Sequence, residues 1–436
     1  MTRQRLADRL ATAAAERAAK DLRRPRRRID ARDGMRVVVD GHSLVNFCSN
    51  DYLGLSQHLD VVSALQACAS TQGVGSGASA LVSGHHAEHA ALEGECAQWM
   101  GYERGLYFGS GYVANLAVMQ SLLGPGDLCV QDKRNHACLV DGARLSGCEF
   151  KRYPHADVEG ATLRLSSHRD GVALLATDGV FSMDGDLAPL RELALLARSQ
   201  EATLYVDDAH GIGVLAPQGR GSTVQQGLTA KEVPLLLLPM GKAFGGQGAM
   251  LLGDAATIGH IAETARPYLF STAPAPAMAA AMRAALALLR TDAWRRAKLA
   301  SLVARFRREA LTAGLPLLES YTPIQPIVLG GNAAALRAAK ALEASGFLVG
   351  AIRPPTVAEG QARLRVTLSA LHSEAQVDAL VKALVRICSD QPTVAAVAAD
   401  AANAKARIAA KAAAIAHAAV APVANVAPIA DPVVAS

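Results

Sequence analysis

The chain has 436 residues, which is long enough to bury a large core and to form two domains. Apolar residues make up 51% and aromatic residues only 4%, a composition that favours helix-rich α/β packing over a β-sandwich. No apolar run approaches the length that spans a bilayer and no charged-then-apolar signal peptide opens the chain, so we expect a cytoplasmic protein with no membrane partner.

The N-terminal segment, residues 1–45, is predicted to be a basic arm. The net charge of +5 is concentrated there, because residues 1–36 hold 12 Lys/Arg against 5 Asp/Glu. A solvated helix is the plain interpretation. The alternative is that its arginine cluster (Arg23, Arg24 and residues 26–28) meets an anionic carrier such as coenzyme A or an acyl carrier protein. A basic arm on a near-neutral body is not typical of nucleic-acid-binding proteins, so we expect no nucleic acid partner.

Residues 46–288 are predicted to form a large domain around a mostly parallel sheet, because helix and strand patterns alternate along them. Helices are predicted at residues 61–70, 86–100, 112–123, 134–146 and 187–200. Strands are predicted at residues 106–108, 128–131, 172–176, 204–206, 235–238 and 249–252. In open sheets of this kind ligands bind beyond the carboxyl ends of the strands, so the residues that follow them are candidate site residues.

A proline-rich stretch at residues 271–276 breaks this alternation, and a smaller α+β domain is predicted at residues 289–390. Its strands are expected near residues 324–329 and 364–368, and its helices near 332–344 and 374–387. Nearly half of residues 391–436 are alanine and few are charged. A short helix without an apolar face is marginal in water, so this segment is predicted to be a mobile or partly helical tail.

The cysteines and histidines do not indicate a metal site. The seven cysteines are odd in number and scattered, and no Cys-x-x-Cys spacing occurs, so neither a disulfide framework nor a zinc site is indicated. His85 and His89 are one helical turn apart and could chelate a metal, but no further ligand pattern follows them. Ordinary polar residues are the favoured interpretation, and we expect no metal.

The strongest chemical signal lies at the ends of two predicted strands. Asp207 ends the apolar run 204–206, and Lys242 lies among glycines 35 residues later. A pyridoxal 5'-phosphate (PLP) enzyme needs a lysine amine that holds the aldehyde as a Schiff base, and a carboxylate that keeps the pyridine nitrogen protonated. The pair therefore predicts a PLP site with Asp207 and Lys242 as catalytic residues.

A P-loop nucleotidase is the rival interpretation of the same residues. Apolar residues followed by two aspartates resemble its magnesium-binding strand, and a glycine-lysine pair resembles its phosphate loop. A P-loop requires a hydroxyl residue after the lysine, where this chain has Ala243, and a glycine where it has Leu236. Either half of the signal alone is more often structural, but together they favour PLP.

A glycine turn supports this interpretation. Residues 109–112 (Gly-Ser-Gly-Tyr) join a predicted strand to a helix, so their N–H groups and the helix dipole can receive a phosphate. Residues 135–136 and 177–185 follow, and then the Asp207 and Lys242 segments. This is the order expected of a fold-type I PLP enzyme.

On these residues the chain resembles the α-oxoamine synthases, which are fold-type I PLP-dependent acyltransferases. The matching stretches are residues 46–55, 179–186, 206–211, 219–222, 352–357 and 363–368. Together they cover roughly residues 20–388. The resemblance implies an α/β fold in which a large domain with a mostly parallel sheet carries the smaller C-terminal α+β domain. It also implies a homodimer.

The resemblance implies cofactor roles for individual residues. Lys242 would hold the cofactor and move protons at the substrate α-carbon, while Asp207 would pair with the pyridinium nitrogen. His136 would stack on the ring, and His210 and Ser182 would lie near its phenolic oxygen. The implied catalytic residues are Lys242, His136, Asp207 and His210. The implied cofactor-binding residues are Ser110, Gly111, Tyr112, His136, Ser182, Asp207, His210, Lys242, Ser271 and Thr272.

Other implied roles concern the substrates and the second subunit. Asn50 and Arg365 would hold the amino-acid carboxylate, for which a guanidinium is the natural partner. Arg23 is the candidate partner for a distal carboxylate of the acyl group, and Thr356 completes the substrate-binding set. Ser271 and Thr272 would reach the phosphate bound in the neighbouring subunit.

Within the family, the chain resembles members that condense L-alanine with a pimeloyl thioester carried by coenzyme A or an acyl carrier protein. The rival is a sibling that uses glycine or serine with another acyl-CoA. Two siblings tend to place arginine where this chain has Ala80, and a small residue is consistent with a longer acyl chain. A non-catalytic PLP-binding or carrier-binding protein is disfavoured because lysine, aspartate and stacking histidine are all present.

The chain departs from the family at two positions. Family members usually carry threonine three residues before the lysine, where it donates to the phosphate, and this chain has Pro239 there. Phosphate anchoring is therefore expected to depend more on Ser110, Gly111 and Thr272. Asp178 stands where close relatives often have glutamate, and the sequence indicates no role for it.

Overall fold

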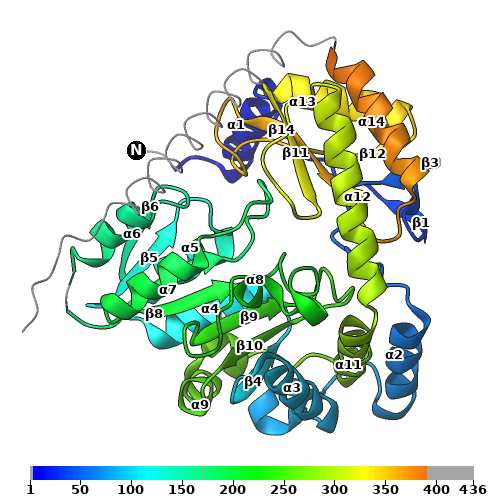
Figure 1. Ribbon diagram of the computed structural model, residues 1–436. Helices are drawn as coiled ribbons and strands as arrows, with labels where there is room; N and C mark the ends of the chain where they lie inside the picture. Colours follow the sequence, from blue (N-terminus) through cyan, green and yellow to red (C-terminus); the bar gives the residue numbers. More distant parts are fainter. Residues whose placement is uncertain (1–2, 169, 390–436) are drawn as a thin grey trace, which may run out of the picture.

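The computed structural model describes residues 3–168 and 170–389, so the predicted tail at 391–436 lies outside the described residues. Its centre is a seven-stranded sheet in the order β4-β10-β9-β8-β7-β5-β6 (Figure 1). Only β10 runs antiparallel to its neighbours, which confirms the predicted mostly parallel sheet. In sheet order the strands are Arg104–Phe108, Ala249–Gly253, Leu235–Pro239, Thr203–Asp207, Ala173–Asp178, Leu128–Asp132 and Glu149–Tyr153.

The sheet is covered on both faces, which explains why its central strands are apolar without alternation. Along β9, Leu236 and Leu238 pack into one core cluster, whereas Leu235 and Leu237 pack into the other. Helices α3 (Ala87–Met100), α6 (Val158–Leu165), α7 (Leu190–Ser199) and α11 (Pro276–Thr291) supply the first cluster. Helices α4 (Gly111–Leu122), α5 (Ala137–Ser146), α9 (Ala255–Thr264) and α10 (Arg266–Leu269) supply the second.

Two helices begin three residues later than predicted. Helix α5 begins at Ala137 rather than at residue 134, because the Asp132 carboxylate accepts the N–H of Arg134 at 2.7 Å and holds a turn there. Helix α7 begins at Leu190 rather than at residue 187, after Pro189. The sequence also failed to indicate α6, α9 and the edge strand β6, whose three central residues are only half-buried.

The smaller C-terminal unit was predicted from its apolar patterns, and the structure confirms its strands and helices. A three-stranded antiparallel sheet has the order β11-β14-β13, with β11 at Ile324–Gly330, β14 at Ala362–Thr367 and β13 at Gly350–Ile352. The long helix α12 leads into it from the large sheet (Figure 1). The helices of this unit are α12 (Ala293–Thr312), α13 (Asn332–Ala344) and α14 (Glu374–Ser389).

The residues predicted to form a basic arm adopt two different structures, a helix and three strands. Helix α1 (Leu6–Ala19) buries no residue, as a solvated helix would. Strands β1 (Ile29–Asp33), β2 (Arg36–Val39) and β3 (His42–Asn46) instead form a sheet with β12 (Phe347–Leu348) of the C-terminal unit. The arm prediction is therefore wrong for residues 29–45. Val37, Val39 and Leu44 form a small buried cluster against Leu348, and this apolar contact outweighs the surrounding charge.

A buried carboxylate packs against three loops next to the strand ends. Asp208 is 0% exposed and accepts the N–H of Ser222 at 2.8 Å, and burial raises the pKa of Asp208 to about 7. A methyl group on Gly179, Gly211 or Gly221 would lie within 2.6 Å of its carboxylate oxygens. Glycine is needed at these positions because the chain passes directly against Asp208.

We predict that Gly179→Ala lowers the free energy of unfolding by roughly 1–3 kcal/mol, because the new Cβ would lie 2.2 Å from Ser222 Oγ. Gly94→Ala is the matched control, since no atom lies within 4 Å of its Cβ position in the exposed part of α3. That control should be neutral or stabilising by up to ~1 kcal/mol. Urea unfolding of both variants measures the difference, and equal midpoints would contradict the packing argument.

Candidate active site

A cavity of about 350 Å³ lies at the carboxyl ends of β7, β8 and β9. This is where an open α/β sheet is expected to bind its ligand. The cavity gathers ten of the residues that the sequence indicated, from seven separate segments of the chain. These residues are Asn50, Ser110, Gly111, Tyr112, His136, Ser182, Asp207, His210, Lys242 and Arg365.

Lys242 enters the cavity three residues after the end of β9. Burial lowers the pKa of its ammonium group, against the opposing charges of Asp207 and Asp178. Within residues 3–168 and 170–389, the Lys242 side chain makes no hydrogen bond or ion pair. A lysine with a lowered pKa and no partner is the form in which an amine acts as a nucleophile or a base.

Asp207 ends β8 and is held by two donors. One carboxylate oxygen accepts a hydrogen bond from Asn115 Nδ2 at 2.7 Å, and the other accepts the Ala209 N–H at 3.1 Å. The side chain is only 4% exposed, so these donors replace water around a buried acceptor. The sequence did not indicate Asn115, because it lies inside an apolar helix pattern with no motif around it.

Asp178 is the register partner of Asp207 on the neighbouring strand β7, and it also lines the cavity. Burial, followed by the charge of Asp207, raises the pKa of Asp178 well above its ordinary value. Its carboxylate accepts one hydrogen bond, from the His136 N–H at 2.8 Å. Asp178 therefore holds a proton more readily than an exposed carboxyl group does.

His210 is neutral, and its neighbour Tyr52 determines its tautomer. Burial, and then the charges of Lys242 and Arg365, lower the pKa of His210 well below its ordinary value. Burial also raises the pKa of Tyr52 to about 12, so its hydroxyl keeps its proton. The hydroxyl lies 2.5 Å from His210 Nδ1 and 3.3 Å from Asn50 Oδ1. Its single proton goes to the nearer and more basic imidazole nitrogen, which leaves the imidazole proton on Nε2. Tyr52 lies in the matching stretch 46–55, but the sequence did not predict it as a site residue.

Arg365 and Asn50, predicted together, lie side by side in the cavity. Arg365 Nε donates to the Ser182 carbonyl at 2.7 Å, and its Nη1 donates to Thr367 Oγ1 at 3.1 Å and to Asn50 Oδ1 at 3.3 Å. These contacts hold the guanidinium plane in one orientation. A fixed guanidinium is suited to bidentate contact with a carboxylate.

The start of α4 forms the side of the cavity proposed for a phosphate. Ser110 precedes the helix, and its hydroxyl accepts the Val113 N–H at 3.3 Å. Pro239 also lines the cavity, with its ring 3.1 Å from where a Cβ of Gly111 would be. Pro239 thus contributes packing and no hydroxyl. The Tyr112 hydroxyl donates a hydrogen bond to the Asp141 carboxylate.

His136 lies between the cavity and α5. Burial lowers the pKa of its imidazole. Its Nδ1 lies 2.8 Å from the Sγ of Cys138, which also lines the cavity. Cys138 was not indicated by the sequence, since a lone cysteine carries no spacing signal.

Four predicted residues lie outside this cavity. Ser271 and Thr272 are exposed, and Thr272 forms an isolated β-bridge with Ser79. Arg23 and Thr356 are exposed as well, and the backbone of each is hydrogen-bonded to Arg353. Within this chain, therefore, neither pair lines the cavity that holds Lys242.

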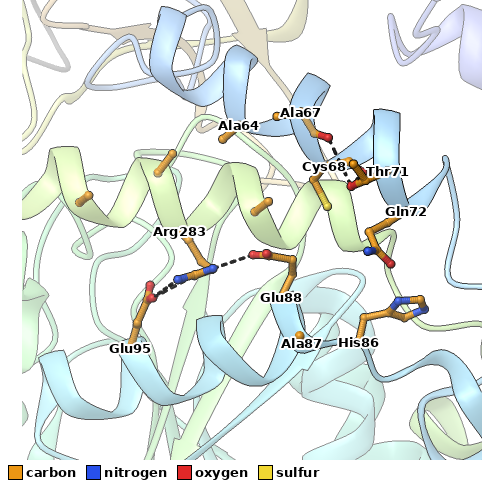
Figure 2. A pocket seen from close by; sticks show the side chains of 13 residues that line it. Ala64, Ala67, Cys68, Thr71, Gln72, His86, Ala87, Glu88, Glu95 and Arg283 are labelled. Carbon is orange, nitrogen blue, oxygen red and sulfur yellow. Dashed lines mark hydrogen bonds and ion pairs between the residues drawn. The ribbon is translucent and has the colours of Figure 1, made fainter.

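A larger cavity of about 600 Å³ lies away from the strand ends, among α2 (Leu59–Gln72), α3 and α11 (Figure 2). Arg283 crosses it and pairs with Glu88 at 2.7 Å and with Glu95 at 2.6 Å. Its charged groups are therefore already paired with one another.

The nearby histidines of the predicted cluster are engaged in hydrogen bonds. His85 pairs with Glu93 at 2.9 Å, and His89 Nε2 lies 2.8 Å from the Pro274 carbonyl. Among the described residues, no group of three or more His, Cys, Asp or Glu side chains is arranged to hold a metal. In the same residues, no helix combines the length and apolar character needed to cross a membrane.

The cavity residues fit PLP. An unpartnered lysine and a buried aspartate with fixed donors converge there, and a glycine turn at a helix N-terminus lies beside them. Together with the mostly parallel sheet, this arrangement defines a fold-type I PLP-dependent enzyme.

Comparison with known proteins narrows this class. Residues 42–384 match the family aminotransferase class I and II. The chain is 54% identical to the 8-amino-7-oxononanoate synthase of Xanthomonas axonopodis pv. citri, over 90% of this chain and 99% of that protein. It is 56% identical to the 8-amino-7-oxononanoate synthase of Stenotrophomonas maltophilia, over 91% of this chain and 97% of that protein.

Solved structures show the same fold. Serine palmitoyltransferase of Sphingomonas wittichii, at 26% identity, has a TM-score of 0.85 over 90% of this chain and 100% of that one. The 8-amino-7-oxononanoate synthase of Francisella tularensis, at 29% identity, has a TM-score of 0.69 over 79% of this chain and 97% of that one. The chain belongs to the 8-amino-7-oxononanoate synthase family of PLP-dependent acyltransferases.

We predict that Tyr52→Phe raises the pKa of His210, because donation to Nδ1 stabilises the neutral imidazole. His210 is active when neutral, so the acid limb of the turnover profile should move to higher pH, by up to about one unit. The variant should also lose ~1–2 kcal/mol of stability, since Nδ1 is left buried without a partner. Turnover measured from pH 5 to 8 and urea unfolding test both effects.

Tyr102→Phe is the matched control for that variant. The Tyr102 hydroxyl donates to the Val233 carbonyl at 2.7 Å and takes no part in lining the cavity. An acid limb that moves equally in both variants, or in neither, would show that Tyr52 does not set the tautomer of His210.

Proposed function

We propose that this protein catalyses the decarboxylative condensation of L-alanine with a pimeloyl thioester in biotin biosynthesis. The products are 8-amino-7-oxononanoate, carbon dioxide and the free carrier thiol. The observation that carries the proposal is the convergence of Lys242, Asp207 and the Asn50–Arg365 pair in one cavity. The identity to curated 8-amino-7-oxononanoate synthases extends over nearly the whole described chain.

The cofactor would be held from three sides of the cavity. Asp207 would keep the pyridine nitrogen protonated, His136 would lie against the ring, and the N–H groups after Ser110 would bind the phosphate. Bound PLP supplies an electron sink for the negative charge that develops at the amino-acid α-carbon. His210 would donate from Nε2 to the phenolic oxygen, because its Nδ1 already accepts from Tyr52.

The amino acid would be oriented by Arg365 and Asn50 and deprotonated by Lys242. Arg365 is held by Ser182 and Thr367, so it can bind the alanine carboxylate without first reorganising. Lys242 has a lowered pKa, so a neutral amine is available to take the proton from the α-carbon and to return one after carbon dioxide leaves.

A homodimer is part of the proposal. The Ser79–Thr272 bridge brings together two segments that carry large exposed apolar side chains. Leu81 is 55% exposed, Val82 79% and Phe270 73%. An apolar patch of this kind on a surface favours contact with another chain. Ser271 and Thr272 lie at this patch, so they would meet the phosphate bound in the other subunit.

We predict that Lys242→Ala lowers turnover by at least ~10³-fold, because it removes the group that moves protons at the α-carbon. Lys231→Ala, at an exposed position outside the cavity, should leave turnover unchanged. Borohydride treatment of the PLP-loaded wild-type protein should attach the cofactor to Lys242, as read by peptide mass. An adduct on any other lysine would contradict the assignment.

The substrate assignment is tested by competition among acyl donors and amino acids, with the products identified by mass. We expect pimeloyl thioesters to be preferred far above acetyl, succinyl and palmitoyl donors. Alanine should exceed glycine by only ~1–3 kcal/mol, since a methyl pocket discriminates weakly. If glycine or serine with another acyl-CoA proves the best pair, the chain is a sibling α-oxoamine synthase.

The same assay tests Arg23 as the partner of the distal carboxylate. Arg23→Ala should reduce the preference for pimeloyl donors, whereas Arg26→Ala, the same charge change three residues away, should not. Equal donor preferences in the two variants would remove Arg23 from the substrate site.

A further inference from the structure

Asp207 is the last member of a buried hydrogen-bonded chain that begins at Tyr205. The Tyr205 hydroxyl lies 2.6 Å from Asn115 Oδ1, and Asn115 Nδ2 lies 2.7 Å from an Asp207 carboxylate oxygen. Tyr205 and Asn115 are both 0% exposed. Tyr205 precedes Asp207 by two residues on β8, so both side chains leave the same face of the sheet, where α4 brings Asn115.

The direction of each hydrogen bond follows from the chemistry of the groups. An ionised carboxylate only accepts, so Asn115 must present its N–H to Asp207 and its carbonyl oxygen to Tyr205. Tyr205 must then be the donor. Burial, and then the charge of Asp207, raise the pKa of Tyr205 well above its ordinary value, so its hydroxyl keeps the proton that it donates.

We propose that Tyr205 and Asn115 are positioning residues that keep the Asp207 carboxylate charged and in one orientation. This rests on the proposed function, in which Asp207 pairs with the cofactor nitrogen. Tyr205 acts only through Asn115: its hydroxyl prevents the amide from turning its oxygen toward Asp207. Neither residue lines the cavity, so neither touches a substrate.

Asp207 needs such positioning because a second carboxyl group, that of Asp178, is its register partner on the next strand. Two buried carboxyl groups in register cannot both remain charged at low cost, so one of them takes up a proton. The number of hydrogen-bond donors decides which of the two carboxyl groups takes up the proton. Asp207 has the Asn115 and Ala209 N–H groups, whereas Asp178 has only that of His136. Without Asn115 each of the two carboxyl groups would keep a single N–H donor.

Other ionisable groups around Asp207 do not replace the amide. The Asn115 amide is the neutral donor from α4, and its Nδ2 also lies 3.0 Å from Cys138 Sγ. Cys138 is a neutral thiol, because burial raises its pKa. The ionisable groups that face Asp207 are Asp178 from β7, Tyr205 from β8, His136 and Cys138 from the start of α5, and Lys242 after β9.

The test compares Tyr205→Phe, Asn115→Ala and the double variant with the wild-type protein. Two quantities are measured: the affinity of the apo-protein for PLP by equilibrium dialysis, and the exchange of the alanine α-proton in D₂O at pH 5–9 without acyl donor. Tyr205→Phe should weaken PLP binding about three- to tenfold and Asn115→Ala about ten- to a hundredfold. In both, the acid limb of exchange should move to higher pH, because Asp207 loses a donor to its charged form.

The double variant makes the test specific. If Tyr205 acts only through the amide, adding Tyr205→Phe to Asn115→Ala should change neither PLP affinity nor the acid limb further. Tyr102→Phe is the control, since it removes a tyrosine hydroxyl of the same kind without touching this chain of contacts. Thermal unfolding of each apo-protein separates these effects from a general loss of stability.

The outcomes distinguish this inference from the proposed function. If the wild-type protein binds PLP and exchanges the α-proton but Tyr205→Phe changes neither affinity nor acid limb, the positioning role is wrong while the proposed function stands. Additive effects in the double variant would also overturn it, because Tyr205 would then act by another route. If the wild-type protein itself neither binds PLP nor exchanges the proton, both proposals fall.

Discussion

A single buried negative charge, on Asp207, is the feature on which the rest of the site depends. The carboxylate is 4% exposed and lies in register with a second carboxyl group on the next strand. A buried carboxylate needs hydrogen-bond donors in place of the water that it has lost. Asn115 and the Ala209 N–H supply them.

The same buried environment also shifts the pKa values of other ionisable groups in the cavity. Lys242 has a lowered pKa and His210 is neutral because neither can keep its charge away from water at low cost. The Arg365 guanidinium donates to the Ser182 carbonyl and the Thr367 hydroxyl, which replace water around it. One cavity thus holds the Asp207 carboxylate, the Arg365 guanidinium and a lysine amine of lowered pKa.

The positions of these groups depend on how closely the ends of neighbouring strands approach one another. Asp208, directly after Asp207, is packed against glycines from three loops, and any side chain there would overlap its carboxylate. The stretch that follows β7 is therefore held against the stretch that follows β8. This packing holds the ends of the two strands that carry the register partners Asp178 and Asp207 in place.

The sequence by itself determined the mostly parallel sheet and indicated ten residues that the structure brings together in one cavity. This was possible because apolar runs report burial and because Asp207, Lys242 and Arg365 lie in motifs of characteristic spacing. It could not reveal Asn115, Tyr205 or Cys138 as neighbours of the site, since each lies within an ordinary helix or strand pattern. Tyr52 lies in a matching stretch, but the sequence indicated no role for it. Tertiary structure alone decided that residues 29–46 join the C-terminal unit, and that Asn115 meets Asp207. Both depend on contacts between segments far apart in the chain, and no local pattern records such contacts.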